Sequence, residues 1–110
     1  MIEQIIIDYL SAIVTACAEV PAEYPSGAFC VVEKTGGGRR ETIKSARIAV
    51  QCYAATLAEA AALCERVADY MEGLTGLDAV ARCALESSYN FTDAAQRHYR
   101  YQAVFDVAYY

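Results

Sequence analysis

The sequence predicts an α+β domain in which a four-stranded antiparallel sheet carries two helices on one face. Three observations lead to this prediction. Two segments repeat apolar residues at helical spacing, four segments alternate between two faces, and together they follow the order α-β-β-α-β-β. The length of 110 residues suits one domain with one modest core, so residues 1–110 are expected to form a single unit.

The first helix is predicted over residues 2–18. Its apolar residues recur at steps of three and four, the spacing of one helix face. They are Ile2, Ile5, Ile6, Tyr9, Leu10, Ile13, Val14 and Cys17. Pro21 and Pro25 follow, and the segment between them is expected to be extended or irregular because proline interrupts a helix.

The first two strands are predicted over residues 28–34 and 43–54. Residues 35–42 between them contain three consecutive glycines and are expected to form a flexible connection. Together these segments predict a long hairpin with a mobile Gly-rich tip.

The second helix is predicted to begin after Thr56. Glu59, three residues later, completes a capping-box pattern, and Gly73 and Gly76 mark the end of the helix. The buried stripe is predicted to contain Ala60, Leu63, Cys64, Val67, Met71 and Leu74. The last two strands are predicted over residues 80–89 and 99–108, joined by turn-forming residues at 90–97.

The sheet face opposite the helices is less polar than a face that meets only water. Strand alternation places five apolar or aromatic side chains on it, among Arg and Gln residues. They are Ala49, Tyr53, Val104, Ala108 and Tyr110. We expect a neighbouring copy to cover part of this face.

The charge of the chain is unevenly distributed. Residues 34–47 hold five of the nine basic residues and one acidic residue, a net charge of +4, while the whole chain carries −5, which leaves −9 on the remainder. An acidic body with one basic segment is unlike a general nucleic-acid binder. The predicted partner-contact loop consists of Lys34, Gly36, Gly37, Gly38, Arg39, Arg40 and Lys44.

Catalytic, metal and cofactor sites find little support in the sequence. The five cysteines are widely spaced and include no Cys-x-x-Cys pair, and no signal-peptide pattern precedes them, so we expect reduced core thiols in the cytosol. No apolar run is long enough to cross a bilayer. The only candidate nucleophile pair is Cys30 with His98, which lacks an identifiable orienting residue. The sequence therefore predicts a protein that is not an enzyme and binds no metal or cofactor.

The glycine run leaves one ligand-binding alternative open. Its free amides and the adjacent Arg39 and Arg40 could hold an anion, as in a small regulator that orders around an anionic metabolite. The run lacks phosphate-loop spacing, however, and no helix follows it.

Several segments, taken in order, resemble the tail-terminator group, the small tail-completion proteins of long-tailed bacteriophages and prophages. These segments are VPAEYP at 20–25, EKTGGG at 33–38, ARIAVQCYA at 46–54, the alanine-rich helix opened by Thr56, SYNFTD at 88–93 and HYRYQ at 98–102. The resemblance covers most of the chain. None of the motifs is catalytic.

The resemblance implies an α+β subunit that closes into a homo-oligomeric ring, usually of six copies, at the head-facing end of the tail. Its expected partners are the tail tube protein and the head-completion protein, with DNA passing through the bore without sequence-specific binding. The expected location is the host cytoplasm during assembly and then the virion. An acidic body fits a bore that repels DNA, and the basic hairpin tip would contact either a neighbouring copy or the head-side partner. A different neck or minor tail component is the nearest alternative.

Overall fold

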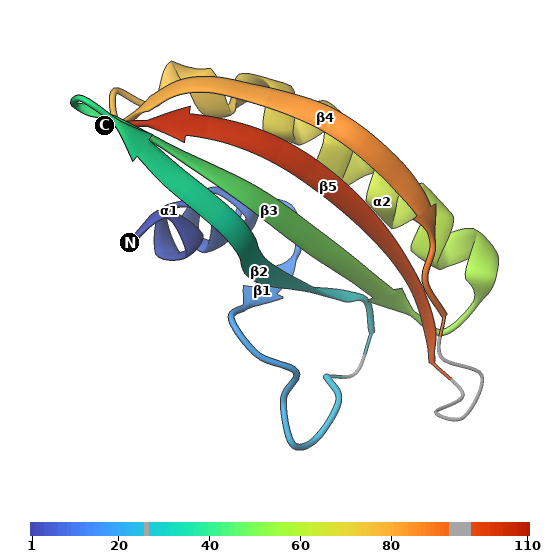
Figure 1. Cartoon of the computed structure of the whole chain (residues 1–110). Helices are drawn as coiled ribbons and strands as arrows, with labels where there is room; N and C mark the ends of the chain where they lie inside the picture. Colours follow the sequence, from blue (N-terminus) through green and yellow to red (C-terminus); the bar gives the residue numbers. More distant parts are fainter. Residues whose placement is uncertain (26, 93–97) are drawn as a thin grey trace.

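The computed structural model describes residues 1–25, 27–92 and 98–110, which form a curved sheet with both helices on one side (Figure 1). The α-helices are α1 (Ile2–Leu10) and α2 (Leu57–Met71), and a 3-10 helix, η1 (Glu72–Gly76), follows α2 directly. The strands are β1 (Thr15–Cys17), β2 (Phe29–Arg40), β3 (Ile43–Ala54), β4 (Val80–Asn90) and β5 (Tyr99–Tyr109). Most of the predicted connection at 90–97 lies outside the described residues, as does Asp93 of the SYNFTD motif.

The strand order in the sheet is β1-β2-β3-β5-β4. β1 runs parallel to β2, and every other neighbouring pair is antiparallel. Over the described residues the chain is therefore α+β with two α-helices, but the predicted four-stranded antiparallel sheet and the order α-β-β-α-β-β are wrong. The sheet has five strands and is mixed.

The error arises where the first helix was predicted to continue to residue 18. α1 ends at Leu10, and Ser11 closes its last turn by donating from its hydroxyl to the Ile7 carbonyl at 2.7 Å. The following residues, 13–15, are all β-branched and favour extended backbone. They lead into β1, where Thr15–Cys17 pairs with Phe29, Cys30 and Val31 of β2.

The main core lies between the two helices and the sheet face that they cover. Ile6 and Leu10 of α1 and Met71 of α2 are fully buried there against Ile48 and Phe105. The predicted buried stripe of the second helix is confirmed, since all six of its residues are buried. Burying each large side chain of this kind contributes about 1.5–3 kcal/mol to stability.

A second, smaller cluster lies on the other face of the sheet, at the end next to β1. The rings of Phe29 and Tyr53 stack with centroids 4.6 Å apart, and Val31 is buried beside them. Tyr24, from the connection between β1 and β2, packs edge-on against both rings, at 5.5 and 6.0 Å. One end of this face is therefore covered by the chain itself.

Candidate functional site

The candidate site is the distal half of the β2–β3 hairpin. The ladder between the strands continues to the pair Arg40 and Ile43, so only Glu41 and Thr42 form the turn. Glu41 has a φ of 58°, in the left-handed region that lets the chain reverse direction. The predicted flexible connection over 35–42 is therefore wrong, because most of that segment is strand.

A bulge separates the two halves of the hairpin. The register shifts between Lys34 and Gly36, and the intervening Thr35 donates from its hydroxyl to the Arg47 carbonyl at 3.4 Å. Beyond the bulge, a Cβ on Gly37 would lie 2.7 Å from the backbone oxygen of Ser45 and 2.7 Å from Cε of Lys34. Glycine at position 37 therefore permits a close approach that any side chain would obstruct.

Apart from Arg47, the basic side chains of the hairpin form no ion pairs within the described part of the chain. Arg47 is the exception near the bulge, since it reaches Glu86 of β4 at 3.0 Å. The four basic members of the predicted contact loop, Lys34, Arg39, Arg40 and Lys44, have no carboxylate partner among the described residues. Nζ of Lys44 lies 5.7 Å from the ring centroid of Tyr109. The positive charge of this segment is therefore available to something outside the chain.

One side of the hairpin forms an open depression of about 430 Å³. It is lined by Lys34, Gly37, Gly38, Arg39, Lys44 and Tyr109. Five of the seven predicted contact residues thus come together, whereas Gly36 and Arg40 do not line the depression. The sequence did not predict Tyr109 as a member of this site, because Tyr109 reaches it only by pairing with Lys44 across the sheet.

The predicted oligomer face offers less free apolar surface than its sequence indicated. Ala49 and Tyr53 are buried within the chain itself, Val104 and Ala108 are half-buried, and Tyr110 is 60% exposed. Tyr53 is covered by the aromatic cluster described above, a role of Tyr24 and Phe29 that the sequence analysis missed.

Polar side chains on the same face bond to one another across three strands. Gln51 of β3 donates to Gln102 of β5 at 3.1 Å, and Gln102 donates in turn to the hydroxyl of Tyr89 on β4. Arg100 donates to the hydroxyl of Tyr53 at 3.1 Å. Because these groups satisfy one another, a partner on this face would have to compete with existing hydrogen bonds.

The structure does not place the candidate nucleophile pair in contact. Cys30 is fully buried on the helix-covered face, with its Sγ 3.7 Å from Sγ of Cys52. His98 is exposed and its ring lies 3.9 Å, centroid to centroid, from Tyr24, which covers the opposite face of the sheet. The base and the thiol are therefore held on opposite sides of the sheet.

The other thiols are also poorly placed for chemistry. A hydrogen bond from Cys52 lowers the pKa of Cys64 to about 7, but Cys64 is only 1% exposed. Burial raises the pKa of Cys83 to about 11, so this half-buried thiol stays protonated at neutral pH. Within residues 1–25, 27–92 and 98–110 no group of His, Cys, Asp and Glu could hold a metal ion. Neither α-helix has the length and apolarity needed to span a membrane.

No protein-family model matches this chain, and no curated protein matches it either.

Proposed function

We propose that this chain is a structural assembly subunit of the tail-terminator type, which closes into a ring and uses its basic hairpin as a contact element. One observation carries the proposal. The distal hairpin extends to one end of an elongated subunit (Figure 1). The four basic members of the predicted contact loop have no carboxylate partner within the described chain. Exposed Arg side chains that have no role inside a subunit are characteristic of contacts between subunits.

The rest of the subunit fits a role in assembly. The sheet and helices share one core, and polar side chains on the other face of the sheet bond to one another. The net charge of −9 outside residues 34–47 would keep a DNA-facing bore from adhering to DNA. This assignment to the tail rests on the resemblance in the sequence.

The test is negative-stain electron microscopy together with light scattering, over rising protein concentration and with a divalent cation added. We expect closed rings with a central hole, and their copy number separates a six-membered terminator from another neck component. A parallel assay adds the protein to tails that lack their terminator and measures joining to filled heads. Failure to form rings and failure to restore joining would together contradict the proposal.

A second candidate, the anion-binding regulator, is favoured by the depression beside Gly37 and Gly38. Lys34, Arg39 and Lys44 converge there with two glycines that leave the backbone accessible. This function predicts thermal stabilisation by phosphate-bearing ligands, about 2.7 kcal/mol at one hundred times the Kd. Lys34→Ala should remove the shift, and an unchanged melting temperature across a panel of nucleotides and sugar phosphates would exclude this candidate.

A further inference from the structure

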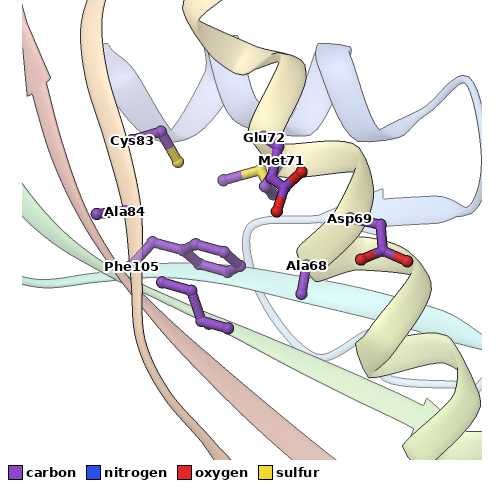
Figure 2. A pocket seen from close by; sticks show the side chains of 8 residues that line it. Ala68, Asp69, Met71, Glu72, Cys83, Ala84 and Phe105 are labelled. Carbon is purple, nitrogen blue, oxygen red and sulfur yellow. The ribbon is translucent and has the colours of Figure 1, made fainter.

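Figure 2 shows the side chains that line a groove between α2 and β4. The properties of this groove complement those of the hairpin tip. β4 is an edge strand, and part of its helix-facing side is left uncovered beside the C-terminal half of α2. The resulting cavity of about 290 Å³, the α2–β4 groove, is lined by Ala68, Asp69, Met71, Glu72, Cys83, Ala84, Leu85 and Phe105.

The α2–β4 groove has an apolar floor and an acidic rim. Met71 and Phe105 are buried at its base, while Leu85 is 50% exposed. On the helix side, Asp69 and Glu72 are exposed and form no ion pair with any described basic residue. Small-molecule pockets measure roughly 300–1,000 Å³, so a cavity at the lower limit of that range suits a single apolar side chain better than a metabolite.

The hairpin tip presents such a side chain. Ile43, the first residue of β3, is 45% exposed. It pairs across the hairpin with Arg40 and is followed by Lys44. Arg39 lies beside them on β2. The tip is therefore an exposed aliphatic group beside Arg40 on one face of the hairpin, with Arg39 and Lys44 on the other face and Glu41 in the turn. The groove is an apolar floor bordered by carboxylates.

We propose that the hairpin tip of one copy docks in the α2–β4 groove of a second copy. Ile43 occupies the apolar floor, and Arg39 and Arg40 meet Asp69 and Glu72. This inference rests on the proposed ring-forming function and identifies its contact: of the two partners that the sequence left open for the tip, it selects the neighbouring copy.

The topology requires the contact to be between molecules. The tip belongs to β2 and β3, whereas the groove lies at the far edge of the sheet, beyond β5. Because β5 lies between the hairpin and β4 in the same sheet, a tip cannot enter its own groove. A contact between two different surfaces is heterologous, and such contacts build rings when the rotation closes. The apolar anchor supplies affinity, while the charged rim sets orientation and association rate.

The experiment uses two charge-reversed variants of the full chain. The tip-reversed variant carries Arg39→Glu and Arg40→Glu, and the groove-reversed variant carries Asp69→Lys and Glu72→Lys. In either variant alone, like charges meet at every contact, so self-association measured by sedimentation velocity should weaken at least tenfold. When the two are mixed, each acidic tip meets a basic groove and each basic tip meets an acidic groove, so alternating assemblies should form. A chain with all four substitutions should also assemble by itself.

Controls separate the docking from folding and from net charge. Glu65→Lys with Asp78→Lys gives the same net charge as the groove-reversed variant, at exposed positions outside the groove, and should assemble like the unmodified chain. Ile43→Asp should weaken assembly without any change in circular dichroism.

The outcomes distinguish the docking from the proposed function. If either charge-reversed variant assembles as well as the unmodified chain, or if the mixture fails to assemble, the docking is wrong. Electron microscopy then tests ring formation independently. Recovery in the mixture as closed dimers alone supports the docking and contradicts the ring. An unmodified chain that stays monomeric, with no association in the mixture, overturns the docking, and the tail-joining assay then tests the function separately.

Discussion

The two halves of β2 belong to one strand and pair with one neighbour, yet they occupy different environments. The first four residues, 29–32, are all buried, and the last eight, 33–40, are all exposed. The proximal half has the helices over one face and the Tyr24 cluster over the other. The distal half has neither, and its described contacts with β3 are the backbone ladder and the bond from the Thr35 hydroxyl to the Arg47 carbonyl. This difference teaches that one strand can anchor the core and also present uncommitted side chains to a partner.

The largest loss of stability is expected from a substitution in the proximal half of β2. Phe29→Ala removes a ring that is 2% exposed and stacked on Tyr53, and should lower the free energy of unfolding by about 3–5 kcal/mol. Urea denaturation measures the change. The matched truncation at the hairpin tip, Ile43→Ala on β3 opposite Arg40, should change stability by less than about 0.5 kcal/mol. Equal losses at both positions would refute the distinction between the halves.

A smaller loss of stability is expected from a substitution that disrupts only the distal part of the β2–β3 ladder. Gly37→Val forces side-chain atoms against the Ser45 carbonyl and should cost about 1–3 kcal/mol, confined to the tip. Hydrogen exchange should show lost protection for amides at 36–46 and retained protection for those of 29–32. Gly36→Ala is the control, because a Cβ there meets nothing within 4 Å. Loss of protection throughout β2 would mean that the halves are not independent.

Raising the pH tests the core separately from the hairpin tip, because the thiol of Cys83 packs beside the core. Burial raises the pKa of Cys83 from 9.0 to about 11, and the Asp106 carboxylate adds to the rise. The folded chain therefore holds a proton that the unfolded chain releases. This contribution to stability is complete below pH 9 and is lost as the pH rises to about 11.

Urea midpoints measured under reducing conditions should thus fall less steeply between pH 9 and 11 for Cys83→Ala than for the unmodified chain. Arg40→Ala, at the hairpin tip, should keep the original slope. A Cys83→Ala profile with an unchanged slope would rule out this thiol as the source.

The smallest expected effect is at the exposed charges. Arg39→Ala with Arg40→Ala should leave the free energy of unfolding within about 0.5 kcal/mol of the unmodified value, since neither side chain has an ion-pair partner in the described chain. Thermal unfolding at a concentration too low for assembly is the measurement. A loss of 2 kcal/mol or more would show that the tip stabilises its own subunit.

Much of the candidate site could be predicted, but its conformation could not. The excess of positive charge at 34–47 is a property of composition, and the hairpin follows from two strands close together in sequence. The three consecutive glycines predict a flexible connection, because glycine permits many backbone conformations. Gly37 instead lies in the ladder, where its missing side chain makes room for Lys34 and for the Ser45 carbonyl.

Features that depend on local periodicity could be predicted from the sequence. The capping threonine of α2 accepts the predicted bond from the Glu59 amide at 3.2 Å, and the apolar stripe of that helix is buried. Alternation along β3 also assigned Ile48 and Ala49 correctly to opposite faces. These patterns repeat within a few residues, so neighbouring side chains are enough to reveal them.

The mixed sheet and the α2–β4 groove depend instead on contacts between segments that are far apart in the chain. The residues of β1 continue the helical spacing of α1, and what makes them a strand is pairing with Phe29, Cys30 and Val31, far along the chain. The α2–β4 groove exists because α2 lies over the middle of the sheet and leaves Leu85 on the edge strand uncovered. Both features depend on the free energies of contact between distant segments. The local pattern of apolar residues does not predict which of these segments will pack against each other.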